Sequence, residues 1–208
     1  MGEDQAGLRE ALKRVATALK ETGVPFALAG GYAAWARGGP EPDHDVDFLV
    51  DPEDADKVAT RLGEHGLRIV HPPEDWLFKV FTDDSMVDVL YRAAGSDSVG
   101  PALERATDTE VLSVWMPVLS ATDVMAQKLS VLGERYCDLG AVLPSARALR
   151  EQVDWDIVRE TVAGNPYAEV TLDLFARLDL IAPPTGTPPS TGPGTGLGTG
   201  EGQAPAGT

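Results

Sequence analysis

The spacing of apolar residues predicts a helix and then a strand at the start of the chain. Four apolar residues recur at helical spacing among charged neighbours: Leu8, Leu12, Val15 and Leu19. Gly23 and Pro25 then end this amphipathic helix. Residues 26–29 form a short apolar run, which predicts a buried strand leading directly into Gly30 and Gly31. Good helix formers follow in residues 32–37, so a strand–glycine–helix unit is expected.

Further apolar runs predict a sheet with one more helix between its strands. Residues 46–50 read as a strand, and Asp51 and Pro52 then provide the start of a helix that runs to about residue 64. Strands are expected at residues 67–70, 77–81 and 86–91. A turn at residues 82–85 joins the last two into a hairpin, which places residues 86–91 beside the strand of residues 46–50.

The pattern in the second half of the chain predicts one strand followed by helices. Residues 111–118 are rich in β-formers, and Pro117 near their end is consistent with an edge strand. Ser120 provides an N-cap for the next helix, with Asp123 three residues later. Further helical patterns are seen at residues 141–151, 155–163 and 167–180. The fold class is therefore α/β (α+β), with a mixed sheet and a mostly helical C-terminal half.

These patterns divide the chain into three parts. Residues 1–118 are expected to form the core that contains the sheet, and residues 119–182 a helical C-terminal part. Residues 183–208 are nearly all Pro, Gly, Thr, Ser and Ala, with Leu197 as their one large apolar residue. Such a segment cannot bury enough surface to offset the entropy of ordering it, so a disordered tail is expected.

Three carboxylates stand in strands that otherwise favour burial. Side chains alternate along a strand, so Asp45 and Asp47 project from one face while Val46 and Phe48 face the other. Asp88 is the single charge in the apolar run 86–91. Carboxylates held this close repel unless a cation or shared proton separates them. Oxygen ligands suit Mg2+, so the three predict a magnesium site that accepts a polyphosphate.

Composition and charge limit the kinds of molecule that the protein is expected to bind. The 208 residues carry a net charge of −16, and residues 38–56 contain eight acids but neither Lys nor Arg. This charge disfavours a nucleic-acid footprint and favours a metal and a small neutral or cationic substrate. Cys137 is the single cysteine, which excludes an intramolecular disulfide, and it reads as buried packing rather than a nucleophile. No apolar run is long enough for a membrane helix, so a cytoplasmic protein is expected.

The combination of Gly30-Gly31, Asp45-x-Asp47 and a later Asp88 resembles the nucleotidyltransferase superfamily, built on the DNA-polymerase-β-like catalytic fold. It is most similar to small bacterial antibiotic-modifying or toxin-type members. The resemblance extends over residues 26–149, including the helix that carries Lys128. One departure concerns the segment before the aspartate pair: relatives commonly carry a basic residue and Ser or Thr there, whereas this chain has Glu41 and Asp43.

The resemblance implies an enzyme that transfers a nucleoside monophosphate from a nucleoside triphosphate to a hydroxyl group and releases pyrophosphate. It implies that Asp45, Asp47 and Asp88 are catalytic and bind two Mg2+ ions. Gly30, Gly31 and Lys128 would contact the triphosphate. Antibiotic-modifying relatives suggest a small acceptor, which the acidic charge favours, and toxin-type relatives suggest tRNA. A catalytically quiet nucleotide-binding module, acting with a partner protein in a two-protein toxin system, is a further alternative.

Several of these residues also have ordinary structural interpretations. Asp88 could pair with Lys79 or Arg92 in the hairpin, and Lys128 could be a solvated helix lysine. His44 is expected to face away from the aspartate pair and is given no catalytic role. Tyr32, Trp35 and Trp76 could line a base or substrate pocket, but aromatic residues beside a strand–helix turn more often belong to the core.

Overall fold

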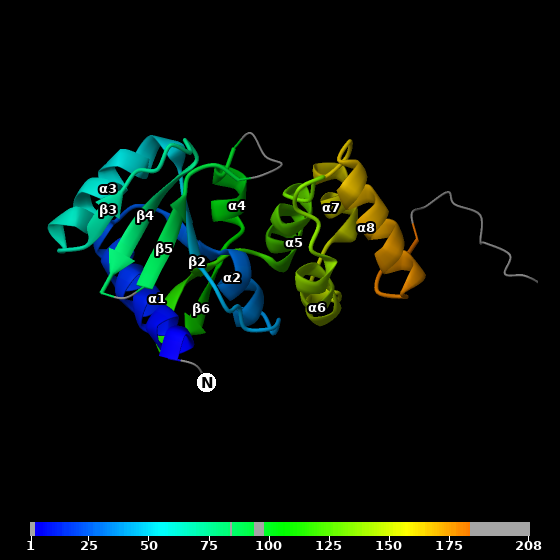
Figure 1. The fold of residues 1–208 in the computed structure, drawn as a ribbon, viewed down its shortest axis with the longest axis horizontal. Coiled ribbons are helices and arrows are strands. Elements are labelled where there is room, and N and C mark those ends of the chain that lie inside the picture. The colour runs from blue at the N-terminus through cyan, green and yellow to red at the C-terminus, as the bar shows by residue number, and fades with distance from the viewer. Residues whose placement is uncertain (1–2, 84, 94–97, 184–208) are drawn as a thin grey trace, which may run out of the picture.

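The computed structural model describes residues 3–83, 85–93 and 98–183, and shows a mixed sheet joined to a group of helices (Figure 1). The strands are β1 Phe26–Ala29, β2 Val46–Val50, β3 Arg68–Val70, β4 Leu77–Thr82, β5 Ser85–Leu90, β6 Thr107–Val111 and β7 Val114–Val118. The helices are α1 Glu3–Thr22, α2 Gly30–Ala36, α3 Ala55–Glu64, α4 Gly100–Glu104, α5 Ala121–Ser130, α6 Leu139–Leu149, α7 Trp155–Thr161 and α8 Pro166–Arg177, and a 3-10 turn spans Pro52–Asp54. The tail predicted to be disordered lies, beyond Pro183, outside the described residues.

All seven strands belong to one sheet, in the order β3-β4-β5-β2-β1-β7-β6. Strand β1 runs antiparallel to β2, and β2 runs parallel to β5. The β4–β5 hairpin is antiparallel, as the turn at residues 82–85 predicts. The sequence prediction of a mixed sheet is therefore confirmed.

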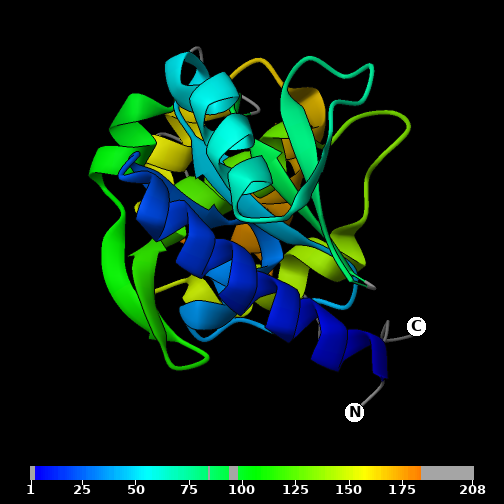
Figure 2. The same ribbon diagram turned by 90° about the vertical axis from the view of Figure 1, so that its left-hand side faces the viewer.

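Helix α1 packs across one face of this sheet. Figure 2 shows it passing in front of the strands, with α3 beside it. Its predicted apolar stripe is buried: Leu12, Val15 and Leu19 have no exposed surface. Burying side chains of this size contributes about 1.5–3 kcal/mol each. A Cβ on Gly7 of α1 would lie 2.7 Å from Ser85 Oγ, so Ser85 faces α1. Because side chains alternate along β5, Asp88 points to the opposite face of the sheet.

The region around residues 107–118 differs from the sequence prediction. Instead of one edge strand at residues 111–118, the chain forms the β6–β7 hairpin, whose turn residues Leu112 and Ser113 both have positive φ angles of 52° and 65°. Strand β6 carries acids and lacks an apolar alternation, so pairing with β7 holds it in place. Pro117 is not on the edge strand. It is tolerated because β7 pairs with β1 at one register position, Leu28 with Val118.

The helices after β7 gather at one end of the molecule (Figure 1). Ser120 caps α5, its hydroxyl oxygen accepting from the Asp123 amide, which confirms the predicted N-cap. Asp138, Asp154 and Asn165 cap α6, α7 and α8 in the same way. Each of these four helices begins at a capping side chain. Their order is the one predicted from the sequence, and their bounds agree with the prediction to within a few residues. Among the described helices, none is both long and apolar enough to cross a bilayer.

Candidate active site

A row of four paired residues crosses the sheet at its centre. Asp47 of β2 pairs with Ala29 of β1 on one side and with Asp88 of β5 on the other. Asp88 in turn pairs with Lys79 of β4. Residues directly opposite each other on neighbouring strands project from the same face, about 5 Å apart. The sheet therefore brings Asp47 and Asp88 together, as the hairpin prediction required.

Asp47 is the most perturbed acid in this row. Its pKa is raised to about 7 by burial first, and then by the negative charges of Asp45 and Asp88. Asp45 lies one residue before β2 and is exposed, so it approaches Asp47 from the rim of the sheet. Lys128 and Lys79 both lower the same pKa but do not overcome burial. The cluster is thus three carboxylates flanked by two ammonium groups.

Lys128 joins the cluster from the last turn of α5. Burial lowers the pKa of Lys128, and the charges of Asp47 and Asp45 oppose that change. Helix α5 packs against α2, which places a lysine about 80 residues later in the chain within electrostatic reach of both aspartates. The interpretation of Lys128 as a fully solvated lysine is wrong. Its contact with a triphosphate stays a prediction.

The two glycines allow close approaches of the chain to itself. Gly30 has a φ of 58°, and a Cβ built there would lie 1.8 Å from Asp47 Oδ2. A Cβ on Gly31 would lie 2.7 Å from Pro42 Cβ, in the acidic segment before β2. Gly30 therefore makes room for the Asp47 carboxylate, and Gly31 makes room for the loop. Contact of either glycine with phosphate stays a prediction.

Asp88 is held by the lysine across the hairpin. Lys79 Nζ donates to Asp88 Oδ1 at 2.9 Å and to Oδ2 at 3.2 Å. Of the two predicted partners of Asp88, Lys79 is therefore the one that binds it, and Arg92 pairs instead with Asp75. Within residues 3–83, 85–93 and 98–183, no three Asp, Glu, His or Cys side chains are grouped closely enough to hold a metal ion as they stand.

The donor set nevertheless suits a hard divalent cation. All three candidate ligands are carboxylates, and the charges of Asp45 and Asp88 add to the effect of burial in raising the pKa of Asp47. A divalent cation relieves the repulsion among these charges and takes oxygen ligands. The residues therefore fit Mg2+, provided that Asp88 turns from Lys79 toward Asp47.

Arg9 stabilises the acidic segment, a role that the sequence analysis missed. Its guanidinium donates from Nε and Nη2 to the two Glu41 oxygens, both at 2.6 Å. The same group lies 5.7 Å from the centre of the Trp35 ring. Glu41, which departs from the pattern of the superfamily, is thereby neutralised within the molecule. Tyr32 lies beneath, fully buried, with a hydroxyl that has no hydrogen-bond partner among the described residues.

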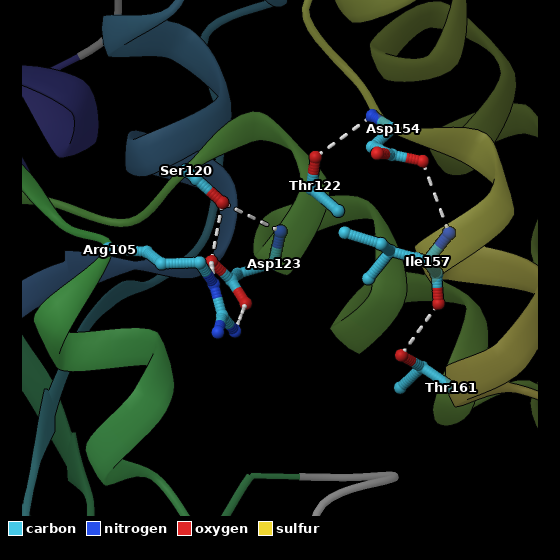
Figure 3. A network of polar contacts seen from close by, with 7 residues as sticks. All are labelled: Arg105, Ser120, Thr122, Asp123, Asp154, Ile157 and Thr161. Carbon is cyan, nitrogen blue, oxygen red and sulfur yellow. Dashed lines mark hydrogen bonds and ion pairs between the residues drawn. The ribbon is translucent and has the colours of Figure 1, made fainter.

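Two arginines fix the position of α5 and thus of Lys128. Arg37, at the end of α2, donates to the backbone oxygens of Val118 and Leu119, immediately before α5. Arg105 binds both carboxylate oxygens of the buried Asp123, at 2.5 and 3.2 Å (Figure 3). Neither partner is close in sequence, so only the folded chain identifies these roles.

The beginning of α5 is also tied to α7. Figure 3 shows the Thr122 hydroxyl accepting from the backbone amide of Asp154, which caps α7. A cavity of about 80 Å3 lies beside this network, where α4, α5 and α7 meet. A larger hollow of about 440 Å3 lies along α1 and is lined by none of the candidate acids.

The solvent exposure of the remaining candidate residues can be compared with their predicted roles. Cys137 is exposed, so the prediction that it packs in the core is wrong. It follows a tight turn closed by Gly133 and Tyr136, where little of the chain covers it. The core interpretation is confirmed for Tyr32, while Trp76 is 43% exposed. His44 is exposed at the rim.

Comparisons with known proteins identify the fold. No family model matches the sequence, and a search of the curated proteins finds no match. Among solved structures, the solution structure of the antibiotic-resistance factor ANT(2'')-Ia aligns with 84% of this chain and 99% of its own, at a TM-score of 0.57 and 15% identity. Its crystal structure in complex with adenylyl-2''-tobramycin aligns over 78% and 98%, at 0.54 and 14%.

A third solved structure aligns with a similar share of the chain. It is an antigenic nucleotidyltransferase-like protein from Paracoccidioides brasiliensis, which aligns with 84% of this chain and 93% of its own, at a TM-score of 0.55 and 15% identity. These alignments span nearly the whole of each neighbour, so the likeness includes the helical part as well as the sheet. The chain accordingly has the fold of the nucleotidyltransferases.

Proposed function

We propose that this protein is a magnesium-dependent nucleotidyltransferase that transfers a nucleoside monophosphate from a nucleoside triphosphate to a hydroxyl of a small acceptor. One observation carries the proposal: Asp47 and Asp88 stand side by side on neighbouring strands, and the charges of Asp45 and Lys128 both act on the Asp47 carboxylate. On a nucleotidyltransferase fold, carboxylates in this arrangement support metal-assisted phosphoryl transfer.

In the proposed site, Asp45 and Asp47 would hold both metal ions and Asp88 would hold one. Two bound Mg2+ ions would activate the attacking oxygen and neutralise the charge on the leaving pyrophosphate. Lys128 would provide a further positive charge to the triphosphate, and the backbone at Gly30 and Gly31 would approach its oxygens closely.

The reaction breaks one bond and forms one. The acceptor oxygen bonds to the α-phosphorus as the bond from that phosphorus to the bridging oxygen breaks, and pyrophosphate leaves with the electron pair. Asp88 is the group that would accept the proton of the attacking hydroxyl. Its carboxylate is part-buried at the centre of the sheet, on the strand next to Asp47.

Charge supports a small neutral or cationic acceptor. Asp45 and Asp47 of the acidic segment 38–56, together with Asp88, place negative charge at the site, which repels a phosphate backbone and attracts an amine. ANT(2'')-Ia, which shares the fold, has been solved with adenylyl-2''-tobramycin. An aminoglycoside-like polycation is therefore the acceptor class to test first, with total tRNA as the alternative.

The test incubates purified protein with α-labelled nucleoside triphosphates, Mg2+, and either amino-hydroxyl compounds or total tRNA. We expect label on a small molecule with the native protein and not with Asp47→Asn. Asp173→Asn is the matched control, because Asp173 is an exposed acid on α8. Label on RNA alone would overturn the acceptor class. Nucleotide binding without transfer or pyrophosphate release would support the quiet binding module instead.

A further inference from the structure

Lys79 occupies an unusual position for a lysine. It lies in the middle of β4, an inner strand, between Val70 of β3 and Asp88 of β5. Its neighbours Phe78 and Val80 are completely buried, while the Lys79 side chain is 27% exposed. An apolar residue would suit the stem of this side chain equally well. The ammonium group is therefore explained by what it contacts, the Asp88 carboxylate.

Asp88 stands between two competing neighbours. On one side lies Lys79, which now binds both of its oxygens, and on the other lies Asp47. Ligand oxygens on one Mg2+ ion lie about 3 Å apart, because each bond is about 2.1 Å long. Carboxylates on neighbouring strands must therefore turn toward each other to share an ion. Asp88 instead faces the opposite neighbour.

We infer that Lys79 competes with the divalent metal for the Asp88 carboxylate and so weakens metal binding at this site. The inference rests on the proposed function, because it requires that Asp88 be a metal ligand. In the metal-free protein, the ammonium neutralises one of the three crowded carboxylates. When metal binds, at least one Asp88 oxygen must leave Lys79 Nζ. The long, partly exposed side chain of Lys79 can then move toward solvent without disturbing β4.

The direction of the effect distinguishes competition from support. A residue that merely orients a metal ligand strengthens metal binding, so removing it lowers the metal affinity by about 10- to 100-fold. A competing cation has the opposite effect, since it repels the incoming ion and occupies its ligand. For Lys79→Met we therefore expect Mn2+ to bind about ten-fold more tightly than to the native protein.

The experiment measures Mn2+ alone, by electron paramagnetic resonance of the free ion, and Mg2+ alone by calorimetry. Lys79→Arg keeps the positive charge and a bidentate grip on Asp88, so its metal affinity should be equal to or below that of the native protein. Lys57→Met is the matched control. It removes a lysine paired with an acid, Asp54, outside the carboxylate cluster, and it should leave metal affinity unchanged.

Thermal unfolding in the presence of a chelator provides a second test of the competition. Without Lys79 the cluster loses a neutralising charge, so Lys79→Met should unfold at a lower temperature than the native protein in the absence of metal. Addition of Mn2+ should recover more of the unfolding temperature in the variant than in the native protein. A purely structural ion pair would produce the first effect without the second.

The outcomes separate this inference from the proposed function. Unchanged or weaker metal binding by Lys79→Met overturns the competition, even if the native protein binds metal and releases pyrophosphate. If the native protein binds neither Mn2+ nor Mg2+ with a nucleoside triphosphate present, the proposed function itself fails, and the inference fails with it.

Discussion

Replacing Gly30 by alanine tests how closely the chain packs around Asp47. Gly30 has a φ of 58°, where an L-residue is strained by about 1–2 kcal/mol. The new Cβ would also lie 1.8 Å from Asp47 Oδ2 and 2.8 Å from its Cγ. Rotation of the Asp47 carboxylate would leave its Cβ 3.1 Å from the new Cβ, and the backbone of β2 cannot shift freely because it is paired on both sides. Overpacking of this kind costs about 1–3 kcal/mol more. The total expected loss of unfolding free energy is about 2–5 kcal/mol.

A matched control separates the two contributions. Gly66 has a φ of 77°, and a Cβ there meets nothing within 4 Å. Gly66→Ala therefore incurs the backbone strain alone, and both substitutions reduce the freedom of the unfolded chain equally. Urea unfolding followed by circular dichroism gives the difference between the two variants. In a chain of this length, the corresponding fall in Tm is about 2–4 °C per kcal/mol.

A double substitution locates the clash. In an Asp47→Ala background the obstructing carboxylate is gone, so Gly30→Ala should then cost about as much as Gly66→Ala. The coupling energy should be about 1–3 kcal/mol, as for residues in direct contact. If Gly30→Ala costs no more than Gly66→Ala, or costs the same with and without the Asp47 carboxylate, the packing described here is refuted.

Three further predictions concern other parts of the molecule. Ser113 is exposed with a positive φ, so Ser113→Gly should raise the unfolding free energy by about 0.5–1 kcal/mol in urea titrations, and a loss would contradict the turn geometry. Cys137 is exposed, so a thiol reagent should modify the native protein at nearly the rate seen in denaturant, and strong protection would contradict its exposure. Asp47 has a folded-state pKa of about 7, above that of the unfolded chain, so the native state binds more protons between pH 4 and 7. In a chelator, stability should fall as pH rises through that window, by on the order of 2–4 kcal/mol, and Asp47→Asn should remove this slope in urea titrations at pH 5 and pH 8.

The local features of the site could be predicted from the sequence. Alternation along a strand is a property of any extended chain, so Asp47 could be placed on the face opposite Val46 and Phe48 without knowledge of the fold. Asp45, predicted on the same strand, lies instead one residue before β2. The turn at residues 82–85 folds its two strands onto each other, which brought Asp88 beside β2 as expected. The Ser120 cap is equally local, because its hydroxyl meets an amide three residues away. The cap and the β4–β5 hairpin join groups that lie close in the chain, whereas the parallel pairing of β5 with β2 joins strands that are distant in the chain.

The β6–β7 hairpin shows where local reasoning failed. Leu112 and Ser113 lack the glycine or asparagine that marks a turn with positive φ, so residues 111–118 resembled one continuous strand. The strand β6 has no apolar alternation and is stabilised by its pairing with β7. Pairing energy from a neighbouring strand overrode the weak local preference, and the sequence carries no separate signal of it.

The partners of the charged residues were decided only by the tertiary structure. The Arg9–Glu41 pair joins residues 32 positions apart, and Arg37 reaches backbone oxygens more than 80 positions away. The sequence left Asp88 a choice of Lys79 or Arg92, and the strand register selected Lys79. Lys128 reaches the carboxylates because α5 packs on α2. Charge attracts any opposite charge within range, so a sequence determines which groups can pair, while the packing of strands and helices determines which ones meet.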